Sequence, residues 1–148
     1  AEVFAKAGVE SVGLYELAER SDYVSCHLPL SNHTRGLIDA AFFSRMKPTA
    51  YFINTSRGAV VNEPDLIAAL KEKRIAGAGL DVFAQEPIGP DHPFCAMDNV
   101  ALTPHSASFA DATFAARARR VGRNVAAVCR GGLPEFVANP QVLDRRRK

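Results

Sequence analysis

Segments with strand character alternate with segments with helix character along this 148-residue chain, and this alternation limits the possible folds more than any other feature. Short apolar runs, or runs of small residues, predict strands over 22–27, 50–54, 76–83 and 100–103. Helical spacing and helix-end signals occur between and after them, over 14–20, 39–46, 62–74 and 110–130. Repeated strand–helix units of this kind predict an α/β fold with a mostly parallel sheet.

Composition excludes several other classes of protein. With 47% apolar and 23% charged residues, the chain can build one hydrophobic core and is unlike a disordered protein. No apolar run approaches the roughly 20 residues of a membrane helix, and no signal or transit peptide opens the sequence, so we expect a cytoplasmic protein with no membrane partner. Cys26, Cys95 and Cys129 are widely spaced and form no CxxC pair, so we expect reduced thiols and no metal site.

The positive charge of the chain is concentrated at its C-terminal end. The formal net charge is +2, from 18 basic and 16 acidic residues, and the run 145–148 is entirely basic. No aromatic residues are interleaved with this run, so we expect a solvated tail and no nucleic-acid partner.

Chemically active side chains come directly after the predicted strands. His27-Leu28-Pro29-Leu30 ends the first, Arg57 follows the second, Asp81 and Glu86 follow the third, and His105 follows the fourth. Ligands of open parallel sheets bind beyond the carboxyl ends of the strands, so we expect these residues to collect at one edge.

The residue types at this edge suggest a reaction. Arg57 offers a planar cation that grips a carboxylate through two hydrogen bonds. His105 can pass a proton to or from a hydroxyl, and Glu86 within reach of the ring would favour the imidazolium. The three fit interconversion of a 2-hydroxy acid and a 2-keto acid, provided that a hydride carrier is supplied.

Four motifs carry a resemblance to a known family. They are the stretches 22–30 (DYVSCHLPL), 52–58 (FINTSRG), 79–87 (GLDVF with Glu-Pro) and 99–105 (Asn-Val through Leu-Thr-Pro-His). In this order and spacing the chain resembles the D-isomer-specific 2-hydroxyacid dehydrogenases, from about residue 12 to 140. The resemblance implies a Rossmann-like, doubly wound parallel sheet, with Arg57, Glu86 and His105 as the catalytic residues.

The resemblance also implies a cofactor, a substrate and an assembly. The cofactor is NAD or NADP, the substrate a small 2-hydroxy or 2-keto acid, and the assembly a homodimer. The residues expected to bind the cofactor are Leu28, Pro29, Thr55, Ser56, Arg57, Asp81, His105 and Ser108.

Part of the expected cofactor domain is missing from the sequence. There is no Gly-x-Gly-x-x-Gly loop, and Gly77-Ala78-Gly79 lies inside a predicted strand, where small residues serve packing. We therefore expect an incomplete Rossmann-like domain over 1–131, including the long helix from about residue 110, and a C-terminal segment over 132–148 that returns toward the substrate domain and ends in the basic tail.

Two alternatives to an oxidoreductase remain open. Transcriptional corepressors of the same fold sense a dinucleotide without catalysis and keep the Arg, Glu and His, and a truncated chain could be inactive alone. Among the other histidines, we expect a structural hydrogen bond for His27 and solvated loop positions for His33 and His92.

Overall fold

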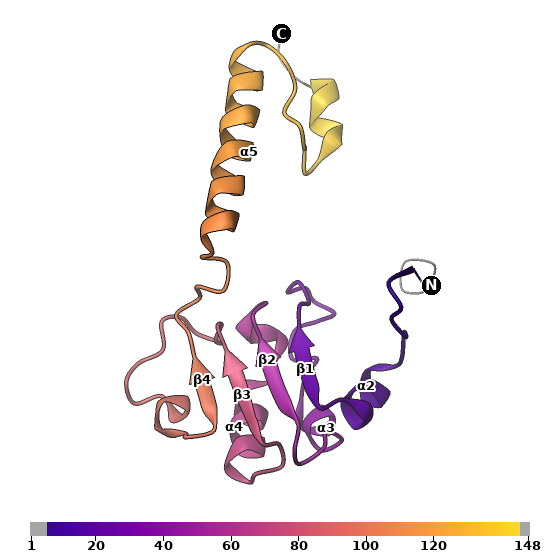
Figure 1. Ribbon diagram of the computed structural model, residues 1–148, viewed down its shortest axis with the longest axis vertical. Coiled ribbons are helices and arrows are strands. Elements are labelled where there is room, and N and C mark those ends of the chain that lie inside the picture. The colour runs from indigo at the N-terminus through magenta and orange to yellow at the C-terminus, as the bar shows by residue number, and fades with distance from the viewer. Residues whose placement is uncertain (1–5, 146–148) are drawn as a thin grey trace. The chain divides into compact units, whose positions relative to one another are not determined.

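Four parallel strands form one sheet, in the same order as in the sequence (Figure 1). They are β1 (Tyr23–Cys26), β2 (Tyr51–Asn54), β3 (Gly77–Leu80) and β4 (Val100–Leu102). The computed structural model describes residues 6–145, and the predicted parallel α/β fold is confirmed.

The strands end level with one another at their carboxyl ends. Cys26 pairs with Asn54, Asn54 with Leu80, and Leu80 with Leu102. The loops after all four strands therefore leave from the same edge of the sheet, as the sequence predicted.

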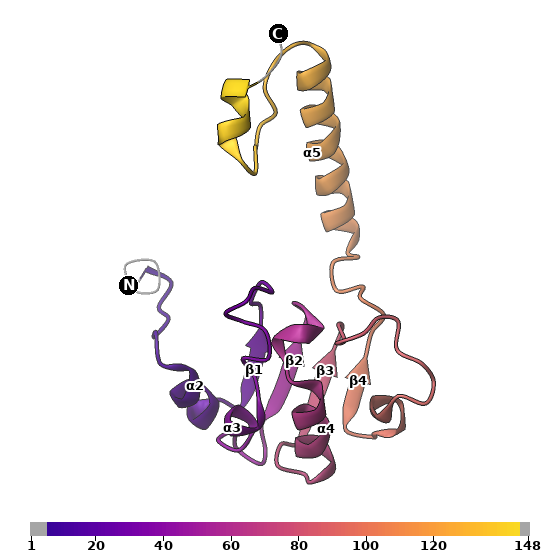
Figure 2. The same cartoon turned by 180° about the vertical axis from the view of Figure 1, so that it is seen from behind.

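Three helices accompany the sheet: α2 (Leu14–Arg20), α3 (Ala40–Phe43) and α4 (Glu63–Lys71). Figure 2 shows α3 and α4 on the same face of the sheet. Asp39 caps α3, because its carboxylate accepts a hydrogen bond of 3.0 Å from the Phe42 amide.

Aromatic rings fill the space between this face and its helices. Phe42, Phe43 and Phe52 are fully buried and meet edge to face, with centroids 5.4 to 6.4 Å apart. On the opposite face, Tyr23 and Tyr51 stack at 5.6 Å and are exposed.

Several predicted elements are shorter in the structure. The helix predicted over 39–46 covers only Ala40–Phe43. The helix predicted over 62–74 ends at Lys71, and Lys73 has a φ of +54°, a left-handed conformation that does not continue a helix. The strand predicted over 76–83 ends at Leu80. Its neighbour β4 ends at Leu102, and beyond Leu80 the amides of Phe83 and Ala84 donate to the side chains of Glu86 and Glu63.

The described residues divide into two compact units, and the second begins at Ser108. It contains α5 (Asp111–Cys129), a returning loop and a 3-10 helix over Pro140–Arg145. Gly131, with a φ of +78°, ends α5 as a left-handed cap. The predicted domain boundary at residue 131 stays a prediction, and most of the basic tail, 146–148, lies outside the described residues.

Contacts within the second unit hold the returning loop along α5. The Arg120 guanidinium lies 4.7 Å from the Phe136 ring centroid, and Arg123 pairs with Glu135 at 3.2 Å. The apolar side of α5 is exposed, at 64% for Phe114 and 61% for Val121.

Over residues 6–145, no helix has the length and apolar composition needed to cross a membrane. The same residues contain no group of His, Cys, Asp and Glu suited to a metal ion. Cys26, Cys95 and Cys129 are free thiols.

Candidate functional site

The loop after β2 is organised by a buried amide. Asn54, the last residue of β2, is 1% exposed. Its Oδ1 accepts hydrogen bonds from the Ser56 amide (3.0 Å) and the Ser56 hydroxyl (2.9 Å), and its Nδ2 donates to the Arg57 carbonyl (3.1 Å). Because a buried amide must find partners, the loop can adopt few other shapes. No role was predicted for Asn54 from the sequence, although a polar residue at the end of an apolar strand could have indicated one.

The same loop presents Arg57 to solvent. Its side chain is exposed and donates one hydrogen bond, from Nη1 to the Ser56 carbonyl at 2.6 Å. In the described part of the chain, the guanidinium forms no ion pair, so most of its five N–H donors remain free for an anion. A guanidinium with free donors of this kind can bind an anion such as a carboxylate.

The loops after β1 and β2 enclose a common hollow. Its volume is about 450 Å³. The lining residues are His27, Leu28, Pro29, Leu30, Thr55, Ser56 and Arg57. The structure therefore brings together the five cofactor-binding residues predicted from these two loops.

His105 and Glu86 form a close pair. His105 Nδ1 lies 2.7 Å from Glu86 Oε2, and the other carboxylate oxygen, Oε1, accepts from the Phe83 amide at 2.9 Å. The hydrogen bond from His105, together with the weaker effect of the one from Phe83, lowers the pKa of Glu86 although partial burial opposes the shift. An ionised Glu86 favours a proton on Nδ1, and Nε2 is then the ring nitrogen that does not contact Glu86.

The ring of His105 borders a second hollow. Its volume is about 420 Å³, and its walls are mainly apolar. The lining residues are Phe83, Glu86, Pro87, Ile88, Pro104 and His105.

His105 has an unusual backbone conformation that Asp81 supports. The φ of His105 is +54°, which costs free energy for any residue with a Cβ. Asp81 is 3% exposed, and its carboxylate accepts hydrogen bonds from the Thr103 hydroxyl and from the amides of Ser106 (2.7 Å) and Ala107 (3.0 Å). The segments before and after His105 are thereby tied to one buried group.

The same bonds determine the charge of Asp81. Burial alone would raise the pKa of Asp81, but the Thr103 hydroxyl and the Ala107 and Ser106 amides together lower it below its ordinary value. Asp81 is thus an ionised anchor for the His105 segment. Its predicted contact with the cofactor stays a prediction.

Ser108 and the other three histidines are the remaining positions with a prediction from the sequence. Ser108 belongs to the second unit, where its hydroxyl oxygen accepts a 3.3 Å hydrogen bond from Arg117, and its cofactor contact stays a prediction. His27 hydrogen bonds to the Ser25 hydroxyl at 2.8 Å, and His33 is exposed. The expectation that His92 is solvated is wrong, because its side chain is only 19% exposed and meets Glu63.

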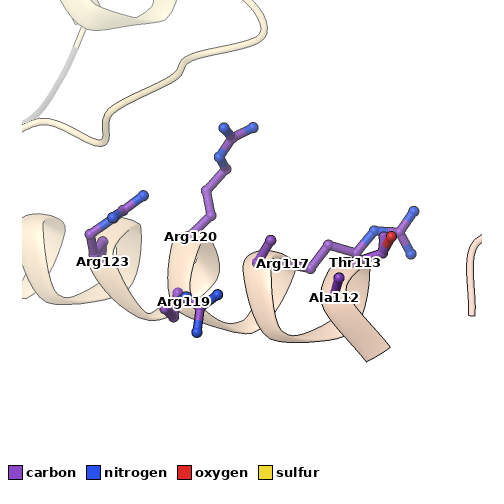
Figure 3. A pocket seen from close by; sticks show the side chains of 7 residues that line it. Ala112, Thr113, Arg117, Arg119, Arg120 and Arg123 are labelled. Atoms are coloured by element: carbon purple, nitrogen blue, oxygen red, sulfur yellow. The ribbon is translucent and has the colours of Figure 1, made fainter. Parts of the chain in front are cut away.

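A third hollow lies entirely on α5. It measures about 490 Å³, and arginine side chains project around it from successive turns of the helix (Figure 3). Arg120 and Arg123 contact the returning loop, and Arg117 bonds to Ser108. We therefore interpret this face as one that holds the second unit together.

Comparison with known proteins supports the same interpretation of the sheet unit. The family described as "D-isomer specific 2-hydroxyacid dehydrogenase, NAD binding domain" matches residues 1–107. A curated glyoxylate reductase of Korarchaeum cryptofilum is 48% identical over 139 residues, which are 94% of this chain and 42% of that protein.

Two solved structures are also similar. D-lactate dehydrogenase of Lactobacillus jensenii with NAD+ superposes with a TM-score of 0.81 at 32% identity, covering 86% of this chain and 42% of its own. A D-isomer-specific 2-hydroxyacid dehydrogenase of Xanthobacter autotrophicus Py2, in complex with NADPH and MES, superposes with a TM-score of 0.71 at 40% identity. The match covers 86% of this chain and 52% of that one.

The chain thus spans about two-fifths to one half of the length of these relatives. The match covers the strands, the loop after each strand and all three residues of the Arg57, Glu86 and His105 set. This chain belongs to the D-isomer-specific 2-hydroxyacid dehydrogenase family and matches the part of it described as the NAD-binding domain.

Proposed function

We propose that the protein containing this chain is an oxidoreductase that interconverts a D-2-hydroxy acid and a 2-keto acid, with NAD or NADP as the hydride carrier. The His105 and Glu86 pair at 2.7 Å is the observation that carries the proposal. A histidine held by an ionised carboxylate at the carboxyl edge of a parallel sheet is suited to general acid–base work.

The residues around the first hollow fit a nicotinamide cofactor. Leu28 and Pro29 supply apolar surface, and Thr55 and Ser56 supply hydroxyl groups on the other side of the same hollow. A nicotinamide ring with its carboxamide requires both kinds of contact. We propose that these four residues, together with Arg57, Asp81, His105 and Ser108, contribute to cofactor binding.

This chain's residues have distinct tasks in the reductive direction. The Arg57 guanidinium binds the substrate carboxylate and fixes the orientation of the neighbouring carbonyl. When bound, a nicotinamide cofactor would be the source of the hydride for the carbonyl carbon. His105 gives the proton on Nε2 to the carbonyl oxygen as its charge develops, and it ends the step neutral. Glu86 stabilises the imidazolium before the transfer and holds the ring in place through Nδ1. In the oxidative direction, neutral His105 takes the hydroxyl proton.

The enzyme assay is direct. The complete gene product that contains this chain is incubated with NADH or NADPH and a panel of 2-keto acids, beginning with glyoxylate because the Korarchaeum cryptofilum relative is a glyoxylate reductase. We expect oxidation of at least one cofactor, and its loss in His105→Asn. If no 2-keto acid causes oxidation of either cofactor, the proposal fails and the corepressor-type alternative or an inactive chain is favoured.

We also propose a cytoplasmic homodimer. Three free thiols suit a reducing compartment. Exposed Phe114, Val121 and Val125 on one side of α5 offer apolar surface for a second copy. Sedimentation of the complete gene product would test this, because a monomer at all concentrations would refute the dimer.

We further propose that residues 1–131 contribute to the dinucleotide-binding domain and that residues 132–148 return toward the substrate domain. The family resemblance supports this division. Limited proteolysis of the complete gene product, with and without NAD, tests it: protection of α5 by the cofactor is the expected result, and equal cleavage in both conditions would contradict it.

A further inference from the structure

One carboxylate at the start of α4 contacts the loop that carries Glu86. Glu63 is the first residue of α4, and its side chain is 17% exposed. Its Oε2 accepts a hydrogen bond from the Ala84 amide at 2.9 Å, and its Oε1 accepts one from His92 Nε2 at 3.2 Å. Glu63 therefore holds the loop containing Glu86 at two points, one on each side of Glu86.

The other nitrogen of His92 determines its role in this contact. Nδ1 accepts from the Phe94 amide at 3.3 Å, so the proton of a neutral ring resides on Nε2 and is donated to Glu63. The imidazole also lies 4.9 Å from the ring of Phe94, which is fully buried. His92 thus connects Glu63 to the hydrophobic core at the far end of the loop.

A second contact ties the same turn to the Arg57 loop. A Cβ added to Gly58 would lie 1.9 Å from the carbonyl carbon and oxygen of Phe83, so the two backbones are in direct contact. The Phe83 amide in turn donates to Glu86 Oε1. The segment that begins with Arg57 therefore contacts the Phe83 and Ala84 backbone at two points, Gly58 and Glu63.

We propose that Glu63 and His92 are positioning residues, which fix the Phe83 and Ala84 turn and thereby hold the Glu86 carboxylate against His105. Neither residue touches the reacting atoms. Their effect on rate rests on the proposed function, whereas their effect on the Glu86 and His105 hydrogen bond does not.

The kinetic test compares three variants in the complete gene product. We expect Glu63→Ala to lower kcat about tenfold, because a displaced Glu86 no longer orients the ring, while KM for the 2-keto acid changes less than about twofold because Arg57 is untouched. His92→Ala should give a smaller loss in the same direction, since the Glu63 bond to Ala84 survives. The double variant should lower kcat no further than Glu63→Ala alone, because both residues act through the same turn.

The matched control is Glu72→Gln. Glu72 lies at the other end of α4, where its carboxylate pairs with Arg74 at 2.9 Å and is 58% exposed. We expect wild-type kcat and KM in this variant. Should Glu63→Ala fail to fold, Glu63→Gln takes its place. Ala84 and His92 contact different oxygens of Glu63, and glutamine has an NH2 group in place of one of them, so one of the two bonds is lost and the same split between kcat and KM is expected.

A second readout is independent of turnover. In protein labelled with 15N-histidine, the His105 Nδ1 proton hydrogen-bonded to Glu86 should give a downfield resonance that is absent from His105→Asn. We expect this resonance to weaken or shift in Glu63→Ala and to remain unchanged in Glu72→Gln. A folded Glu63 variant that keeps both the resonance and wild-type kcat would overturn the inference. A wild-type protein without reductase activity would instead contradict the proposed function, and the resonance alone would then decide the role of Glu63.

Discussion

Replacing Glu86 by glutamine tests the central pair of the site. The change keeps the size of the side chain and removes its charge. His105 and the Phe83 amide contact different oxygens of the carboxylate. A glutamine has an NH2 group in place of one of these oxygens, so only one of the two donors still faces an acceptor.

The magnitude can be worked from the geometry of the pair. A charge-assisted hydrogen bond is worth about 1.5–3 kcal/mol, against about 1 kcal/mol for a neutral one. The His105 side chain is 50% exposed and that of Glu86 35%, so solvent screens the charge and the lower end of the range applies. At that lower end, replacing a charged by a neutral acceptor costs about 0.5 kcal/mol, which corresponds to about a twofold fall in kcat/KM for reduction. Loss of the bond outright costs about 1.5 kcal/mol and corresponds to about a tenfold fall.

The assay is kcat/KM for 2-keto acid reduction at neutral pH. We expect it to fall in Glu86→Gln, because His105 Nδ1 loses the charged partner that holds the ring. The control is Glu19→Gln, which removes a carboxylate from an exposed pair with Arg45 at 2.6 Å. If Glu86→Gln keeps the wild-type kcat/KM, the role assigned to the pair is refuted.

Three further predictions concern the groups around this pair. Arg57→Gln should raise KM for the 2-keto acid at least about tenfold in steady-state kinetics, because the paired hydrogen bonds to the carboxylate are lost; an unchanged KM would contradict carboxylate binding. Gly58→Ala should lower the free energy of unfolding, measured in urea, by about 3 kcal/mol, because its Cβ would collide with the Phe83 backbone. The control Gly89→Ala has open space around it and should leave the free energy of unfolding unchanged. Equal effects of the two substitutions would refute the contact. Because the pKa of Asp81 is lowered in the folded protein, its contribution to stability is complete above the ordinary pKa of 3.8 and is lost as pH falls through the folded-state pKa. Asp81→Asn should therefore be less stable than wild type at neutral pH, and the difference in the free energy of unfolding should narrow in acid.

Local patterns in the sequence were sufficient to predict the elements of the sheet unit. The run 50–54 is apolar and too short for a helix, and it becomes β2 almost unchanged. Because parallel strands end at one edge, the residues directly after each strand were enough to select Arg57, Glu86 and His105. The family resemblance then gave them roles, and the structure brings Glu86 and His105 into contact.

The bonds between these residues could not be predicted from the sequence. Glu63 meets Ala84 and His92 across 21 and 29 positions, and no local period connects residues at such separations. His92 looked like a loop residue because its neighbours are prolines and an aspartate, yet the loop folds back onto α4. Burial of this kind depends on tertiary packing, which a single sequence does not display.

Asp81 and Glu86 both lie in the connection between β3 and β4, but Asp81 holds the backbone beside His105 whereas Glu86 holds its ring. Asp81 is buried, and its bonds to Thr103, Ser106 and Ala107 hold the backbone on both sides of the histidine. Glu86 is partly exposed and holds the ring. A left-handed residue is free to relax unless its backbone and its side chain are both restrained, and here separate carboxylates supply the two restraints. Because the pKa of each is lowered by the bonds it accepts, both restraints persist at neutral pH and weaken together in acid. The orientation of His105 is therefore a property of two ionised groups on the β3 loop rather than of the β4 loop on which it resides.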